Sequence, residues 1–185
     1  MLRELEDERR AREIPPDIWA PDRLRDLLHG DLRGDEVLVV SNREPYIHEE
    51  TPQGIVVKRP ASGLVTAVEP VMRACSGTWI AHGSGSADRL VVDQNDVVAV
   101  PPDNPSYSLK RVWLSKEEEE GYYYGFANEG MWPLCHVAHV RPVFRESDWQ
   151  AYREVNRRFA DAVVAEARGP DPLVLRGLAD QVKVA

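Results

Sequence analysis

A short uninterrupted apolar run, Val-Leu-Val-Val40, is the feature that most constrains the fold of this chain. It follows Gly-Asp-Glu36 and is followed at once by Ser-Asn42, and both flanks are typical of chain reversals. A β-branched run without polar alternation is typical of a strand buried on both faces, and such strands belong to parallel sheets covered by helices. The sequence therefore predicts an α/β fold in which residues 37–40 form a central parallel strand.

The other segments extend this α/β pattern. Residues 44–60 carry prolines and a glycine before an apolar triplet, which predicts an excursion or hairpin. Ser62 precedes a helical pattern, and Ser115 with Glu118 has the spacing of a capping box that begins an acidic helix. Further strands are expected at 78–81, twice within 89–100, at 107–114 and at 173–175, and the longest helix at 147–168.

Length and charge restrict the class of protein. A chain of 185 residues, 43% of them hydrophobic, fits one domain with tails better than two domains. The net charge of -8 argues against nucleic acid and anionic membrane surfaces as partners, since both attract basic faces. No apolar run reaches the ~20 residues that span a membrane. We expect a cytoplasmic protein in which Cys75 and Cys135 are buried free thiols.

Three regions are expected along the chain. Residues 1–34 mix Arg and Glu at helical spacing around Pro15-Pro16, which predicts a helical leader without the apolar segment of a signal peptide. Residues 35–175 carry the α/β pattern. Residues 176–185 lack the apolar density of a core element and are predicted to form a tail.

Two places in the pattern suit an anionic ligand. Arg43 follows the first strand at its carboxyl end, where open α/β sheets hold ligands, and its planar donor fork suits a phosphate. A surface arginine paired with a carboxylate is the alternative interpretation. Ser62 and Gly63, at a helix start, can present backbone N–H groups to an anion or a sugar hydroxyl, although an ordinary N-cap explains them as well.

The densest aromatic cluster lies at 122–136 and includes Tyr123 and Trp132. Sugars bind through aromatic faces combined with hydroxyl and guanidinium hydrogen bonds, whereas core packing is the competing interpretation. The acidic run 117–120 is interpreted as a solvated helix face. No metal or other cofactor is expected, because the histidines and cysteines show no ligand spacing.

Several short motifs, taken in order, resemble the trehalose-6-phosphate synthase family. They are Val-Val-Ser-Asn-Arg43, Ala-Ser-Gly-Leu64, Gly-Thr-Trp-Ile80, Tyr-Tyr-Gly-Phe-Ala-Asn128, Met-Trp-Pro133 and Trp-Gln-Ala-Tyr-Arg-Glu-Val-Asn156. Members of this family, GT20, are retaining glycosyltransferases with the two-domain GT-B architecture. The resemblance covers residues 36–175 and the family's N-terminal domain only in part. It implies a partial Rossmann-like domain, with a mixed or parallel sheet and flanking helices.

The resemblance also implies an activity, the transfer of glucose from UDP-glucose to glucose 6-phosphate in trehalose biosynthesis. By this resemblance Arg43 contacts the phosphate of the acceptor, and Tyr123 and Trp132 line the acceptor site. Ser62 and Gly63 stand where the family carries a Gly-Gly loop near the donor, which puts the donor or acceptor preference in doubt.

Family members continue beyond the strand at 173–175 into a His-Asp-Tyr-His segment and a later Arg/Lys pair, which do not follow here. Positive charge aimed at the developing phosphate is a large catalytic term. We therefore expect an acceptor-side portion of a synthase, inactive alone or dependent on a complementary C-terminal half or a paralogue. A non-catalytic sugar-phosphate-binding module and a synthase with another phosphorylated acceptor, such as glycerol 3-phosphate, stay open as alternatives.

Overall fold

The computed structural model describes residues 26, 30, 36–135, 140–169 and 171–177. The predicted leader therefore lies outside the described residues except for Asp26 and Gly30. The predicted tail is described only at Arg176 and Gly177.

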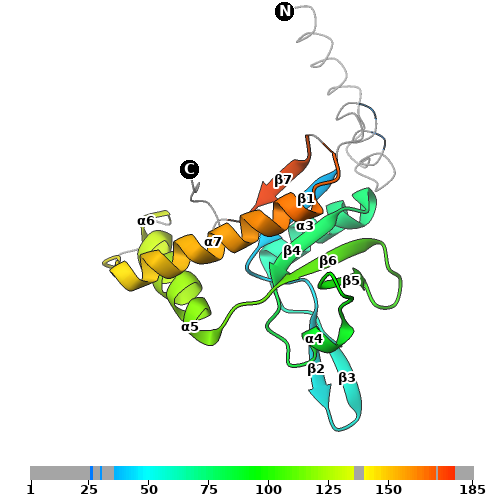
Figure 1. Cartoon of the computed structure of the whole chain (residues 1–185), viewed down its shortest axis with the longest axis horizontal. Coiled ribbons are helices and arrows are strands. Elements are labelled where there is room, and N and C mark those ends of the chain that lie inside the picture. Colours follow the sequence, from blue (N-terminus) through cyan, green and yellow to red (C-terminus); the bar gives the residue numbers. More distant parts are fainter. Residues whose placement is uncertain (1–25, 27–29, 31–35, 136–139, 170, 178–185) are drawn as a thin grey trace, which may run out of the picture.

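A five-stranded sheet forms the frame of the described part of the chain (Figure 1). Its order is β5 (Val97–Val100), β6 (Tyr107–Val112), β4 (Thr78–His82), β1 (Val37–Ser41) and β7 (Leu173–Arg176). β1 pairs in parallel with β4 on one side and with β7 on the other, β4 and β6 are also parallel, and only β5 runs antiparallel to its neighbour. The expected α/β fold with residues 37–40 in a central parallel strand is confirmed.

Helices cover both faces of this sheet, as a strand buried on both sides requires. On one face α3 (Gly63–Cys75) places Met72 in the core cluster that contains Val39. On the other face α7 (Glu146–Glu166) places Phe159 in the core cluster that contains Val40, and Figure 1 shows α7 crossing the sheet. Alternate residues of β1 thus supply two separate cores. Each fully buried apolar side chain contributes about 1.5–3 kcal/mol relative to an exposed one.

The hairpin predicted within residues 44–60 is present. Strands β2 (Ile47–Thr51) and β3 (Gly54–Lys58) pair antiparallel in a sheet of their own, and the hairpin projects away from the five-stranded sheet (Figure 1). Gly54 adopts a φ of 118° at the turn, which a side chain would disfavour.

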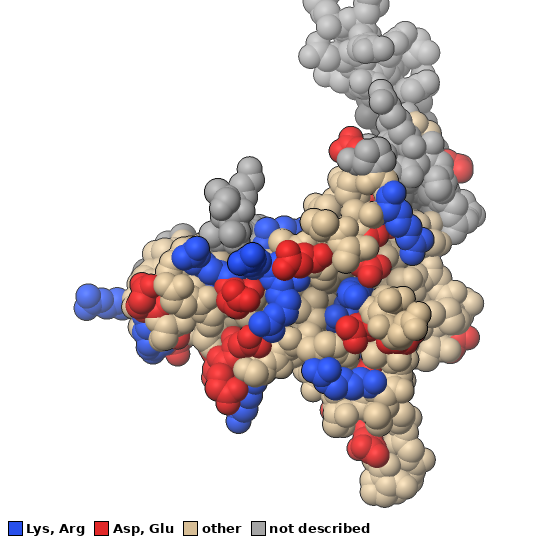
Figure 2. Space-filling view, viewed as in Figure 1, with Lys and Arg blue, Asp and Glu red and all other residues tan. Residues whose placement is uncertain are grey.

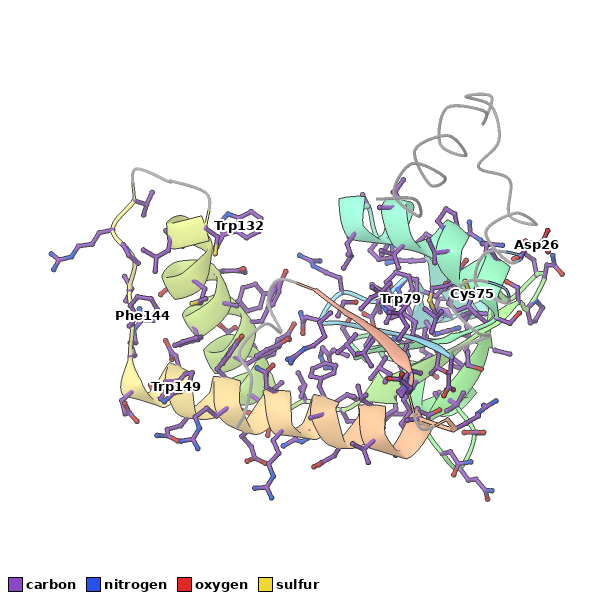
Figure 3. The ribbon with its side chains drawn as sticks, turned by 90° about the horizontal axis from the view of Figure 1, so that it is seen from above. Asp26, Cys75, Trp79, Trp132, Phe144 and Trp149 are labelled. Atoms are coloured by element: carbon purple, nitrogen blue, oxygen red, sulfur yellow. The ribbon has the colours of Figure 1, made fainter. Side chains whose placement is uncertain are left out.

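A continuous helical segment follows β6 and carries the aromatic cluster. It comprises α5 (Lys116–Glu119), the π-helix η1 (Glu120–Met131) and α6 (Trp132–Cys135). The predicted capping box of Ser115 and Glu118 begins it. In Figure 3 this segment stands on the N-terminal half of α7. The approach is close because Gly125 has no side chain: a Cβ there would lie 2.5 Å from Oδ2 of Asp148.

The structure corrects two expectations. Residues 89–100 do not form two strands: the first part is a helical turn, α4 (Asp88–Val91), and only β5 is a strand. The carboxylate of Asp88 causes the turn, because it accepts from the N–H groups of Gly85 and His48 at 2.8 and 2.9 Å. The cysteines are not buried thiols, since Cys75 is half-buried on α3 and Cys135 is exposed on the last short helix.

None of the helices within the described ranges is both long enough and apolar enough to cross a membrane.

Candidate functional site

The ends of β1 and β4 bring the candidate residues together. The two strands are parallel neighbours with Ser41 opposite Ala81, so their carboxyl ends lie at the same edge of the sheet. Asn42 and Arg43 continue from β1, and His82 is the last residue of β4. This edge is where open α/β sheets bind their ligands.

A small pocket opens at this edge. Its cavity measures about 50 Å³, well below the several hundred Å³ of a typical enclosed ligand site. A hexose-sized ligand is too large for this volume and would have to extend beyond it. Its lining comes from the residues after β1, the hairpin, the loop after β4 and the helical segment: Asn42, Arg43, Glu44, Ile47, Pro60, His82, Ser84, Glu119, Tyr123 and Tyr124.

Arg43 and Tyr123 meet in this pocket although they lie far apart in sequence. Nε of Arg43 donates to the Tyr123 hydroxyl at 3.3 Å, and the guanidinium carbon lies 5.7 Å from the centre of the tyrosine ring. The hydrogen bond with Tyr123 raises the pKa of Arg43, so the guanidinium is charged at every physiological pH. Within the described residues Arg43 forms no ion pair with a carboxylate, which leaves its two Nη groups available to an anionic ligand.

A buried ionic cluster supports the floor of the pocket. Arg111 of β6 has no exposed side-chain surface, and its guanidinium donates to Glu44 and to Oδ1 of Asp88, the latter at 2.6 Å. It also donates to the backbone carbonyl of Tyr46 at 2.8 Å. His48 Nδ1 lies 2.9 Å from the same Asp88 oxygen. These bonds fix the segment after β1 and the first hairpin strand against the sheet.

Glu44 is the member of the cluster that also lines the pocket. Burial raises the pKa of its carboxyl group to about 7, against the lowering effect of Arg111 and of the Ser84 hydroxyl and N–H. Loss of hydration of the carboxylate is the main cause, and repulsion from Asp88 adds to it, because one guanidinium faces both carboxylates.

The structure does not bring all the predicted residues to this pocket. Ser62 acts as the N-cap of α3, its hydroxyl accepting from the Val65 N–H at 3.4 Å, and neither Ser62 nor Gly63 lines the pocket. Trp132 is half-exposed on α6; Figure 3 places it at the α6 end of the helical segment, away from Trp149 on α7. Arg43 and Tyr123 are thus the two predicted residues that meet.

A larger open hollow lies between η1 and α7. It measures about 650 Å³, and four carboxylates and two cations line it together with Tyr124. Figure 2 shows acidic side chains gathered on α5 beside it. Carboxylates outnumber cations here, and Arg145 already pairs with Glu129 at 2.7 Å and with Asp148 at 2.9 Å, so this hollow is a weaker candidate for an anionic ligand. Across the described ranges, no three His, Cys, Asp or Glu side chains are grouped so that they could hold a metal ion.

Sequence reasoning missed Asn42, Glu44, His82 and Ser84. His82 could have been predicted, because open α/β sheets bind ligands at the carboxyl ends of their strands. This argument pointed to Arg43 after β1, and it applies equally to His82 at the end of β4. No comparable signal marks Glu44, since its burial depends on Arg111, which lies far along the chain.

The fold, a mostly parallel sheet with helices on both faces, defines a class of protein: the structure matches a part of the N-terminal domain of a GT-B glycosyltransferase. The chain belongs to glycosyltransferase family 20, whose model matches residues 35–176. Curated relatives at 39% and 38% identity include the trehalose-6-phosphate synthases of Mycobacterium ulcerans (strain Agy99) and Mycobacterium avium (strain 104). They align with 75% and 72% of this chain. The chain spans about a quarter of their length, 27% in both cases.

Solved structures of such enzymes share the fold. The trehalose 6-phosphate synthase of Burkholderia multivorans is 25% identical with a TM-score of 0.52, over 77% of this chain and 28% of that one. An E. coli structure bound with UDP-2-fluoro glucose has a TM-score of 0.51 at 23% identity, over 76% and 27%. A Burkholderia xenovorans enzyme in complex with glucose-6-phosphate has a TM-score of 0.53 at 20% identity, over 76% and 27%.

Proposed function

We propose that this chain forms the acceptor side of a trehalose-6-phosphate synthase and binds glucose 6-phosphate at the edge formed by β1 and β4. In the complete reaction the bond between glucose and UDP breaks, a new bond forms to a hydroxyl of the acceptor, and UDP leaves. In this reaction the present chain holds the acceptor, while UDP-glucose is bound mainly by parts of the enzyme outside residues 35–176.

The observation that carries this proposal is the pairing of Arg43 with Tyr123 in the pocket. A guanidinium that is oriented by a tyrosine and has no carboxylate partner within the described residues is a ready phosphate ligand. The ring of Tyr123 also offers a surface of the kind that sugars use. The relatives with glucose-6-phosphate and UDP-2-fluoro glucose bound support the choice of substrates.

Two further features belong to the proposal. The small volume of the pocket fits a site that a second wall completes, so turnover requires a donor-binding part, supplied by the same polypeptide or by a complementary chain. When the donor-binding part is present, Trp132 would join the site on the acceptor side, and Ser62 and Gly63 would join it near the donor.

The cytoplasm, where sugar phosphates are made and used, is the proposed location.

The test is a titration of the full chain with glucose 6-phosphate, followed by NMR chemical shifts so that weak binding is visible. Arg43→Ala should abolish saturable binding, because the phosphate loses its charged partner. Arg157→Ala is the matched control, since Arg157 is an exposed arginine on α7 outside the pocket. Binding by Arg43→Ala that equals the wild type, or no binding by the wild type at any concentration, would contradict the proposal.

A further inference from the structure

Asn42 carries a buried polar atom that the fold leaves unpaired. The residue is only 8% exposed, and Oδ1 has no hydrogen-bond partner among the described residues. Such an atom is unusual, because buried carbonyl oxygens are nearly always paired and an unpaired one destabilises the fold. The neighbouring Ser41 hydroxyl is already engaged, since it accepts from Trp79 Nε1 at 2.9 Å and donates to the Arg43 carbonyl at 2.6 Å.

His82 offers a second acceptor to the same pocket. Its Nδ1 lies 3.1 Å from the Val112 carbonyl oxygen, which can only accept, so Nδ1 carries the proton in the neutral ring. Nε2 is then a bare acceptor, and no described residue donates to it. Burial and the Nδ1 contact with Val112 hold the ring, and Arg111 fixes the backbone there by donating to the His82 carbonyl at 3.2 Å.

We propose that Asn42 and His82 are specificity-determining residues that accept hydrogen bonds from ligand hydroxyl groups, beside the phosphate held by Arg43. This inference rests on the proposed function and deepens it. All three residues line one pocket and lie at the carboxyl ends of two adjacent parallel strands. A cation next to two hydrogen-bond acceptors suits a ligand that joins a phosphate to hydroxyl groups, which is the chemistry of a sugar phosphate or polyol phosphate.

The arrangement also selects against phosphates without hydroxyls. A ligand such as methyl phosphate can satisfy Arg43, but it offers no hydroxyl to the oxygen of Asn42 or to Nε2 of His82. Sites built to bond a hydroxyl reject analogues that lack it for this reason. The ratio of the affinities for glucose 6-phosphate and methyl phosphate therefore measures the contribution of Asn42 and His82. The affinity for methyl phosphate alone measures the contribution of Arg43.

The experiment is an NMR titration of the full chain with glucose 6-phosphate and, separately, with methyl phosphate. Asn42→Leu removes the acceptor at nearly constant volume, and His82→Asn keeps the donor to Val112 but loses the acceptor at the position of Nε2. Each should weaken glucose 6-phosphate binding about three- to tenfold and leave methyl phosphate binding unchanged. His82→Gln, which places a polar atom near the position of Nε2, should retain more of the affinity for glucose 6-phosphate than His82→Asn.

A thermal melt separates this role from a structural one. Asn42→Leu should melt at the same or a higher temperature than the wild type, because it removes an unpaired buried carbonyl. Wild-type affinity for glucose 6-phosphate in both Asn42→Leu and His82→Asn would overturn the inference. So would equal losses for both ligands, which would mean that the residues only position Arg43. If the wild type binds neither ligand, the proposed function fails and this inference fails with it.

Discussion

Arg111 and Asp88 form an ion pair without any exposed side-chain surface, in which Nη2 lies 2.6 Å from Oδ1. The same guanidinium contacts Glu44 and the Tyr46 carbonyl, so one residue of β6 ties together the segment after β1, the hairpin and the helical turn α4. Buried charges of this kind are costly to desolvate and bind their partners in one geometry. The cluster therefore fixes the backbone that directly follows Arg43.

Replacing Arg111 by leucine should destabilise the fold strongly. The substitution leaves Glu44 and Asp88 buried together without a cation, and breaking a buried ion pair in this way costs about 3–5 kcal/mol. Urea unfolding of Arg111→Leu measures the loss. The exposed Arg157→Ala should change the free energy of unfolding by less than about 0.5 kcal/mol. An Arg111→Leu variant as stable as this control would show that the cluster contributes little.

We expect Glu44 to lower the free energy of unfolding as the pH rises from 4.5 to about 7. Its pKa is about 7 in the folded chain against an ordinary value of 4.5, so between these values the folded state binds more protons than the unfolded state. This contribution is complete below pH 4.5 and is lost as the pH rises to 7. At ~1.4 kcal/mol per pH unit, the loss is on the order of 3 kcal/mol.

Glu44→Gln isolates this effect, because glutamine resembles the protonated carboxyl group at every pH. The free energy of unfolding of the wild type should decline relative to that of Glu44→Gln between pH 4.5 and 7. Urea titrations at half-unit intervals measure the difference. Parallel curves for the two proteins would mean that Arg111 keeps the carboxylate ionised and that the pKa of Glu44 is not raised.

The regular elements were predictable because their signals are local. The apolar run that became β1, the N-cap Ser62 and the capping box of Ser115 each act within a few residues. The turn α4 was missed because its cause is a tertiary contact: the carboxylate of Asp88 accepts from His48, on the distant hairpin. The π-helical course of η1 has no sequence signature of comparable strength, and such helices are often found at functional sites.

Gly125→Ala should destabilise the contact between η1 and α7. A Cβ would lie 2.5 Å from Oδ2 of Asp148, whose carboxylate is held by Arg145 at 2.9 Å and cannot move without losing that bond. Overpacking of about 1–3 kcal/mol exceeds the gain of at most about 1 kcal/mol from replacing a helical glycine by alanine. We expect a net loss of about 1–2 kcal/mol in urea unfolding.

Gly63→Ala is the matched control for this substitution. A Cβ at Gly63 meets nothing within 4 Å, so the same change should leave stability unchanged or raise it slightly. Combining Gly125→Ala with Asp148→Ala should restore part of the loss, because the clashing carboxylate is gone. A Gly125→Ala variant more stable than the wild type would show that η1 and α7 can separate at little cost.

The site was predictable to the extent that it depends on strand ends. Arg43 could be placed from the carboxyl-end rule, and the resemblance to the family added Tyr123. The oxygen of Asn42 and the tautomer of His82 could not be inferred, since both depend on which neighbouring groups are already paired in the folded chain.

Tyr123→Phe tests whether the tyrosine hydroxyl orients Arg43. The variant loses the 3.3 Å hydrogen bond but keeps the ring beside the guanidinium, so the fold should be unaffected. Affinity for glucose 6-phosphate should fall about two- to tenfold, because Arg43 must then be ordered by the ligand alone. Tyr107→Phe is the control, since Tyr107 lies at the start of β6 and its hydroxyl donates to Glu69. Equal affinity for glucose 6-phosphate in Tyr123→Phe and Tyr107→Phe would show that the hydroxyl of Tyr123 does not contribute to binding. Only the ring of Tyr123 could then contribute.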